Sequence, residues 1–176
     1  MNQSPLAVVH PEAKIGQNVT IGDNCHIYSH AVILDGARIG NGCSIFPGAV
    51  IAGIPQDLKF NGEQTTAEVG NNTTIRECVT INRGTASKGK TVVGNDCLIM
   101  AYSHIAHDCV LKDHIIIGNA SQIAGEVEID DFAIVSGGSL VHQFTRISKH
   151  VMVQGGSRIG KDIPPYTLIG RDPIVY

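Results

Sequence analysis

Residues 93–135 read VGNDCLIMAYSHIAHDCVLKDHIIIGNASQIAGEVEIDDFAIV, and an aliphatic side chain returns at every sixth position of this stretch. The aliphatic residues of this phase are Val93, Ile99, Ile105, Leu111, Ile117, Ile123, Ile129 and Val135. The same phase continues to Ile159, and it also covers the chain from Val9 to Ile51. A period of six fits neither the 3.6 residues per turn of an α-helix nor the two-residue alternation of a plain strand.

This period predicts an all-β triangular solenoid. Each group of six residues forms a short strand and a corner, three groups close one coil of 18 residues, and the aliphatic side chains point into the prism. Residues eighteen apart should therefore lie over one another in adjacent coils, about 4.8 Å apart. Glycine often follows the aliphatic residue, as at Gly16 and Gly94, and we expect it to serve corners that need positive φ. We predict a single domain over residues 1–176.

The repeat is interrupted twice. Asp57 and Glu63 occupy in-phase positions, where a carboxylate cannot fill a dry core, and Ser87 marks a second break. We therefore predict two external loops, at about 53–68 and 84–92. Ordered excursions from a rigid scaffold often carry binding residues.

The composition excludes several classes of partner. Charged residues make up only 16% of the chain and the formal net charge is −3, so there is no basic field to attract nucleic acid or an anionic membrane. No apolar window approaches the roughly 18 residues of a membrane span, and the N-terminus has no features of a signal peptide. We therefore expect a cytoplasmic protein without nucleic-acid partners or stable membrane insertion.

Five short motifs accompany the repeat. They are Pro55-Gln56-Asp57-Leu58-Lys59, Ile81-Asn82-Arg83-Gly84-Thr85, His104-Ile105-Ala106-His107-Asp108, His142-Gln143-Phe144 and Pro164-Pro165-Tyr166. The repeat resembles the hexapeptide-repeat transferase superfamily over essentially the whole chain, and the five motifs in this order and spacing resemble its UDP-N-acetylglucosamine acyltransferase family. The resemblance implies a left-handed parallel β-helix, a homotrimer with sites between subunits, and a Gram-negative source.

The resemblance also implies an activity. The family moves a 3-hydroxyacyl chain from acyl carrier protein to the 3-hydroxyl of UDP-N-acetylglucosamine, the first step of lipid A biosynthesis. This reaction needs a base for the hydroxyl proton and donors for the oxyanion, and no cofactor or metal is expected.

Three residues are the candidate catalytic group. Histidine has a suitable unperturbed pKa for a base near neutral pH, and the resemblance indicates His107 as the base with Asp108 orienting it. The 18-residue period separately places Gly125 over His107, so an open glycine N–H could lie beside the base. In the family the glycine of this motif position is the oxyanion donor, although Gly125 could instead only permit a corner.

The resemblance assigns substrate contacts to a further group of residues. They are Gln56, Asp57, Lys59, His104, His142 and Gly155. The position of Gly155 limits acyl length in the family, so a glycine there implies room for a long chain. The histidines could instead be hydrogen-bonded corner residues, the loop residues a solvated turn, and Gly155 a turn-forming glycine.

The sequence departs from the family pattern at two places. Glu126 stands where the commonest form of the family has a histidine, so any contact of that imidazole to the nucleotide or acyl amide must be altered or replaced. The sequence stops at Ile174-Val175-Tyr176, where the family continues into a helical region with uridine and phosphate contacts. Either that region is absent or the chain continues past Tyr176, and a protein that ends here is expected to bind the UDP-sugar weakly.

Other functions remain open from the sequence. One is a sibling acyltransferase that acts on a 3-amino sugar or a later lipid A intermediate. Another is a γ-type carbonic anhydrase, which would place zinc on histidines such as His104, His107 and His142, although their spacing is not that of a ligand set. The third is a solenoid that serves only as a scaffold.

Overall fold

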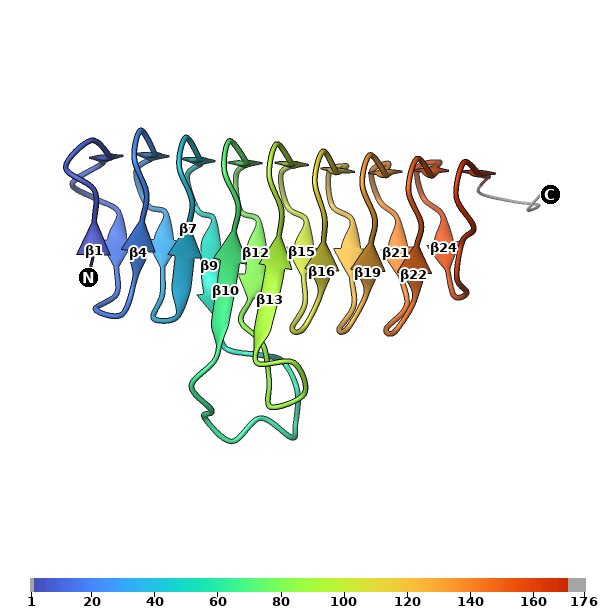
Figure 1. Cartoon of the computed structure of the whole chain (residues 1–176), viewed down its shortest axis with the longest axis horizontal. Helices are drawn as coiled ribbons and strands as arrows, with labels where there is room; N and C mark the ends of the chain where they lie inside the picture. The colour runs from blue at the N-terminus through green and yellow to red at the C-terminus, as the bar shows by residue number, and fades with distance from the viewer. Residues whose placement is uncertain (1, 171–176) are drawn as a thin grey trace.

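The computed structural model describes residues 2–170 of the chain. Within these residues, twenty-five short strands form three parallel sheets around one axis, which gives a left-handed parallel β-helix with the shape of a triangular prism (Figure 1). This confirms the all-β solenoid that the six-residue repeat predicts.

Each sheet takes one strand from every coil. Sheet A contains β1 (Asn2–Gln3), β4 (Thr20–Ile21), β7 (Ala37–Ile39), β10 (Thr66–Val69), β13 (Lys90–Val93), β16 (Val110–Leu111), β19 (Glu128–Ile129) and β22 (Arg146–Ile147). Sheet B contains β2 (Val8–Val9), β5 (His26–Ile27), β8 (Ser44–Ile45), β11 (Thr74–Ile75), β14 (Leu98–Ile99), β17 (Ile116–Ile117), β20 (Ile134–Val135), β23 (Met152–Val153) and β25 (Leu168–Ile169). Sheet C contains β3 (Lys14–Ile15), β6 (Val32–Ile33), β9 (Val50–Gly53), β12 (Thr80–Asn82), β15 (His104–Ile105), β18 (Gln122–Ile123), β21 (Leu140–Val141) and β24 (Arg158–Ile159). Corners are named below for the two sheets that they join.

The strand register follows the predicted coil length. In sheet C, His104 pairs with Gln122 and Ile105 with Ile123, which is a step of eighteen residues. The chain leaves the prism at residues 54–65, between β9 and β10, and again at residues 83–89, between β12 and β13. Both excursions occur at the C–A corner, and they hang side by side from the prism (Figure 1).

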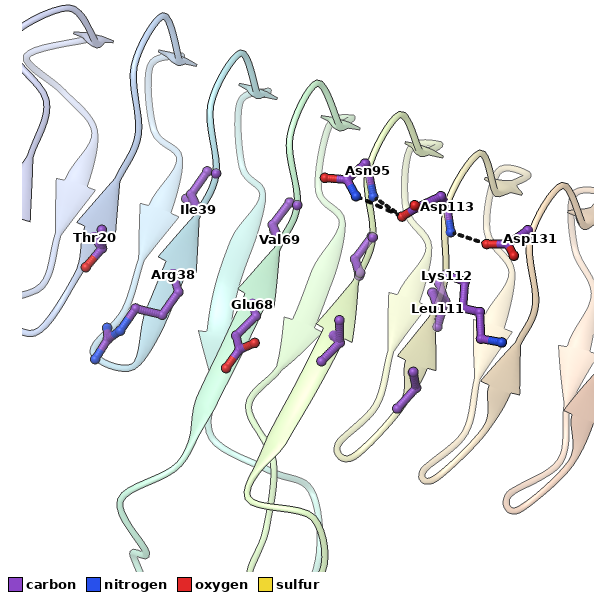
Figure 2. A pocket seen from close by; sticks show the side chains of 16 residues that line it. Thr20, Arg38, Ile39, Glu68, Val69, Asn95, Leu111, Lys112, Asp113 and Asp131 are labelled. Carbon is purple, nitrogen blue, oxygen red and sulfur yellow. Dashed lines mark hydrogen bonds between the residues drawn. The ribbon is translucent and has the colours of Figure 1, made fainter.

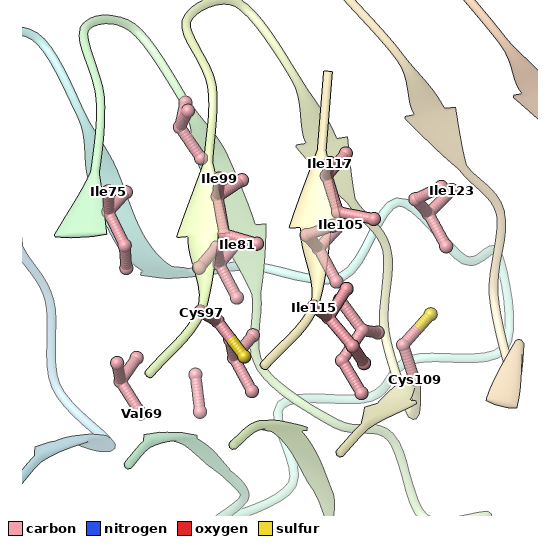
Figure 3. Close-up of a cluster of buried hydrophobic side chains, with 14 of the residues drawn as sticks. Val69, Ile75, Ile81, Cys97, Ile99, Ile105, Cys109, Ile115, Ile117 and Ile123 are labelled. Atoms are coloured by element: carbon pink, nitrogen blue, oxygen red, sulfur yellow. The ribbon is translucent and has the colours of Figure 1, made fainter. Parts of the chain in front are cut away.

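The aliphatic residues of the repeat fill the prism. Ile75, Ile99 and Ile117 from sheet B face Ile81 and Ile105 from sheet C, and all of these side chains are buried (Figure 3). Burial of one such side chain stabilises the fold by roughly 1.5–3 kcal/mol. Because every coil contributes three of them, the outer face of each coil is free to carry polar residues without loss of the core.

The glycines that follow the aliphatic residues do not serve positive φ, so that prediction was wrong. Positive φ falls two residues later, as at Asn24 and Asp96. The glycines are needed for close approach, because a Cβ added to Gly40 would lie 2.6 Å from the side-chain oxygen of Asn71. That oxygen accepts a hydrogen bond from the backbone N–H of Asn41 at 2.8 Å.

This contact recurs along the A–B corner as a ladder of side-chain amides and carboxylates. Asn71 N donates to Asn95 at 2.8 Å, Asn95 N to Asp113 at 2.7 Å, and Asp113 N to Asp131 at 3.0 Å. Figure 2 shows the last two of these hydrogen bonds at the edge of a shallow groove over sheet A. Each coil therefore caps a backbone donor of the coil before it.

We expect Asn71→Ala to lower the free energy of unfolding by about 1 kcal/mol, because the Asn41 N–H loses its acceptor. Asn71→Asp is the control, since it keeps the accepting oxygen and the same group serves at Asp113. Urea denaturation of the two variants measures the difference. Equal destabilisation by both variants would show that the accepting oxygen contributes nothing.

Candidate active site

The candidate catalytic residues lie at the C–A corner, from which both loops also leave. His107 and Asp108 lie one coil beyond the second loop, and Gly125 lies two coils beyond it. His104 and Ile105 form β15, and because side chains alternate across a strand, Ile105 points into the core while His104 faces outward. The chain then turns through His107 and Asp108 before β16 begins. Asp108 has a φ of 60°, a conformation that aspartate adopts more readily than most residues.

His107 and Asp108 form a hydrogen-bonded pair. The Nδ1 atom of His107 lies 2.8 Å from Oδ2 of Asp108, whose side chain is fully buried. A carboxylate at this distance favours the proton on Nδ1, which leaves the Nε2 lone pair available to a reacting hydroxyl. The side chain of His107 is 17% exposed, so the ring is mostly buried but still in contact with solvent.

The buried carboxylate of Asp108 remains ionised because several donors surround it. Thr85 donates through its backbone N–H, at 3.0 Å, and its hydroxyl, at 2.6 Å, and the Lys88 N–H donates at 3.2 Å. Burial alone would raise the pKa of Asp108, but hydrogen bonds from Thr85, His107 and Lys88 outweigh it and hold this pKa below its ordinary value. The negative charge can therefore stabilise an imidazolium on His107.

Gly125 lies directly over His107, as the coil length predicts. A Cβ at Gly125 would lie 2.7 Å from both Cε1 and Nε2 of the imidazole, so only glycine leaves room for this ring position. Within residues 2–170 no acceptor is found for the Gly125 N–H, whereas the next N–H, of Glu126, donates to His107 O at 3.0 Å. A free backbone donor thus lies next to the reactive side of the imidazole.

A groove of about 730 Å³ runs from this corner over the outer face of sheet C. Its lining includes His107, Gly125, His104 and His142, together with Gln56 from the first loop. The sequence-predicted residues of sheet C are therefore brought together. Gln122 and Arg158 also line the groove, and the repeat places them outward on strands β18 and β24.

The surroundings of His104 favour its neutral imidazole. Its Nδ1 lies 2.7 Å from the Thr80 hydroxyl on the neighbouring strand β12. Burial lowers the pKa of His104 below its ordinary value, so the neutral imidazole is favoured near pH 7 and can donate to a substrate or accept from it.

The first loop reaches the base through Asp57. Its Oδ2 lies 3.9 Å from Nε2 of His107, on the side opposite Asp108. The loop is anchored by Asn82, whose side-chain amide donates to Ile54 O at 3.0 Å, and by Arg83, whose guanidinium lies 5.3 Å from the ring centroid of Phe60.

Lys59 and Gly155 do not line this groove. Lys59 is exposed on the first loop, where its N–H donates to the Asp57 carboxylate at 2.9 Å. Gly155 lies at the B–C corner, between β23 and β24, next to Gly137 O. Within one chain, Gly155 and His107 are therefore on different edges of the prism.

Glu126 contacts the second loop. Its carboxylate accepts a hydrogen bond from the Ser87 hydroxyl at 3.0 Å, and it has a φ of 61°. The residue that replaces the usual histidine of the family is thus engaged with the protein itself.

A second groove, of about 590 Å³, runs over sheet A and contains none of the predicted site residues. Two of its charged side chains form ion pairs, Glu68 with Lys90 at 3.1 Å and Lys112 with Asp130 at 2.7 Å. Across residues 2–170, no three histidine, cysteine, aspartate or glutamate side chains are grouped so that they could hold a metal ion. The same residues include no helix long and apolar enough to cross a membrane.

A prism of hexapeptide coils with a histidine–carboxylate pair and an open peptide N–H at one corner is the architecture of a hexapeptide-repeat transferase. The family model for bacterial transferase hexapeptide repeats matches residues 4–35, 18–53 and 90–125. The crystal structure of a UDP-N-acetylglucosamine acyltransferase from Bacteroides fragilis is 56% identical, with a TM-score of 0.85 over 98% of this chain and 72% of that one. The enzyme of that name from Moraxella catarrhalis is 37% identical, with a TM-score of 0.88 over 99% and 73% of the two chains.

Curated relatives are also named as UDP-N-acetylglucosamine acyltransferases. An acyl-[acyl-carrier-protein]–UDP-N-acetylglucosamine O-acyltransferase from Thermodesulfovibrio yellowstonii is 49% identical over 92% of this chain, and one from Chlorobaculum parvum is 49% identical over 60%. The chain spans 63% and 47% of the length of these relatives, respectively. The chain belongs to the UDP-N-acetylglucosamine acyltransferase family.

Proposed function

We propose that this protein transfers a 3-hydroxyacyl chain from acyl carrier protein to the 3-hydroxyl of UDP-N-acetylglucosamine, the first step of lipid A biosynthesis. The observation that carries the proposal is the stacking of His107 and Gly125 in the groove on sheet C. Members of the family with this name act as acyltransferases on this acceptor.

In the proposed mechanism, Nε2 of His107 removes the proton of the sugar hydroxyl while the hydroxyl oxygen attacks the thioester carbonyl carbon. The oxyanion that forms accepts a hydrogen bond from the Gly125 N–H, and Asp108 stabilises the imidazolium. Collapse of the intermediate breaks the carbon–sulfur bond. The imidazolium then returns its proton to the departing thiolate, so that the site is restored.

The groove supplies candidate substrate contacts. His104, His142 and Gln56 line it, and they offer donors and acceptors to the sugar and diphosphate. Asp57 lies beside Nε2 of His107 and is placed to hold the sugar next to the base. Lys59, exposed on the same loop, is the candidate phosphate or acyl contact.

A homotrimer accounts for the position of Gly155. Because Gly155 lies at a different corner from His107 in one chain, it can border the acyl groove only if it comes from a second copy. The outer face of sheet B includes Met152 at 46% exposure and Leu168 at 57%, and an apolar face of this kind is suited to contact between copies. We place this assembly in the cytoplasm.

The test is mass spectrometry of the products from UDP-N-acetylglucosamine and a panel of carrier-bound 3-hydroxyacyl chains. We expect one ester-linked acyl group on the sugar, with a preference for long chains because Gly155 leaves room. A parallel reaction with the 3-amino sugar analogue distinguishes O-acylation from N-acylation. Absence of product with every chain length, or product only with the amino sugar, would contradict the proposed function.

A further inference from the structure

The second loop, residues 83–89, packs against the buried carboxylate of Asp108 through Thr85 and Lys88. Thr85 supplies two of the donors to this carboxylate, and the residue is itself buried, at 6% exposure. We propose that Thr85 is a positioning residue for the acyl-transfer reaction, which fixes the Asp108 carboxylate and through it the imidazole of His107. This inference rests on the proposed function and deepens it.

The hydroxyl of Thr85 has one orientation available. Its oxygen accepts a hydrogen bond from the Ser87 N–H at 3.1 Å, so the hydroxyl proton is directed to Oδ2 of Asp108, at 2.6 Å. The same oxygen of Asp108 contacts Nδ1 of His107 at 2.8 Å. With both partners on Oδ2, rotation of the carboxylate would break the contact that orients the base.

The two ends of the second loop are held close together, and this positions Thr85. The Gly84 N–H donates to Thr66 O at 3.0 Å, and the Thr65 hydroxyl donates to Gly84 O at 2.6 Å. A Cβ at Gly84 would lie 2.6 Å from the Cα of Lys90, so glycine lets the two ends of the loop pass closely. The backbone at Thr85 is thus fixed from both sides.

The far side of the loop is tied to the coil that contains Gly125. Ser87 donates to Glu126 at 3.0 Å, and the Lys88 ammonium lies 3.3 Å from the Glu128 carboxylate. Glu126 is the residue directly after Gly125, so the loop links the base at one coil to the candidate oxyanion donor at the next. Glu126 therefore contributes to the site by binding the second loop, which is a different role from direct contact with substrate.

The test compares Thr85→Val with Thr85→Ser. Valine removes the hydroxyl and keeps the shape, and we expect kcat to fall about ten-fold, the scale on which outer partners of a catalytic group act, while KM changes less than about two-fold. Thr85→Ser keeps the donor and should restore kcat. In an Asp108→Asn background, Thr85→Val should cause no further loss, because the effect of Thr85 passes through the carboxylate.

A spectroscopic measurement tests the role of Thr85 without relying on turnover. Nitrogen-15 NMR of the His107 imidazole in the whole chain should show the Nδ1-protonated tautomer in the unsubstituted protein and in Thr85→Ser, and a mixed population in Thr85→Val. If the unsubstituted protein forms no product, the proposed function fails, while the tautomer shift still decides the role of Thr85. An unchanged tautomer and kcat in Thr85→Val would overturn the inference.

Thr85→Ala is measured beside Thr85→Val, because it removes the donor without placing a second methyl group next to the carboxylate. If both variants lose the folded coil by circular dichroism while Thr85→Ser retains it, the hydroxyl holds the coil together and does not specifically position the base. That result would also overturn the inference.

Discussion

His107→Ala is expected to lower the rate of acyl transfer by about 10²–10⁴-fold, the range that a positioned general base contributes. The remaining site would still hold the sugar and offer the Gly125 N–H, so KM should change little. Steady-state kinetics with UDP-N-acetylglucosamine and a carrier-bound 3-hydroxyacyl chain measure both constants. Turnover close to that of the unsubstituted protein would remove His107 from the mechanism.

The fold should survive this change. Asp108 keeps the donors from Thr85 and Lys88 when the imidazole is removed, so the buried carboxylate is not left without partners. His30→Asn is the matched control, because His30 is a corner histidine with a side chain that is 69% exposed, and its φ of 59° is one that asparagine accepts. We expect the control to keep its turnover, and both variants to keep the thermal midpoint.

The position of Gly125 over His107 could be predicted from the sequence because it depends only on the coil length. Inward isoleucines fix that length, since an insertion of one residue would turn Ile105 or Ile123 out of the core. The position of Gly155 follows from the same arithmetic. Its separation from His107 is two coils and two hexapeptides, which places it at another corner, as the structure has it.

The contacts of the second loop could not be predicted in this way. Thr85 and Ser87 lie where the chain leaves the repeat, so no register relates them to Asp108 or Glu126. Their partners depend on the path of seven residues that the core does not constrain. The sequence motif around Thr85 indicated that the segment matters, but only the folded loop shows that its hydroxyl meets the carboxylate beside the base.

The glycine prediction failed for a different reason. Positive φ was expected at the glycines directly after the aliphatic residue, such as Gly94, yet the structure places it two residues later, both at residues with side chains such as Asp96 and at glycines such as Gly42. The corner tolerates these residues because asparagine, aspartate and histidine are the least disfavoured in this conformation, and packing supports the rest. Most glycines directly after the aliphatic residue lie instead where a neighbouring coil occupies the place of a Cβ, as at Gly16 and Gly40.

Gly125→Ala is expected to lower kcat about 100-fold, because a displacement of roughly 1 Å in a reacting group has an effect of this size. The added Cβ would lie 2.7 Å from Cε1 and Nε2 of His107, so the imidazole must move away from the candidate oxyanion donor. Gly125 does not have a positive φ, so alanine introduces no backbone strain and the thermal midpoint should change little. The predicted defect is therefore one of catalysis and not of folding.

Gly170→Ala is the matched control, since among residues 2–170 its Cβ would meet only the end of the Gln154 side chain, at an ordinary contact distance of 3.4 Å. It should keep the kcat of the unsubstituted protein. The tautomer of His107 in Gly125→Ala should stay unchanged, because the added methyl group removes none of the donors that hold the Asp108 carboxylate against Nδ1. A loss of kcat with an intact tautomer would separate the role of Gly125 from that of Thr85. Full turnover in Gly125→Ala would mean that the imidazole does not work from the position seen beside this glycine.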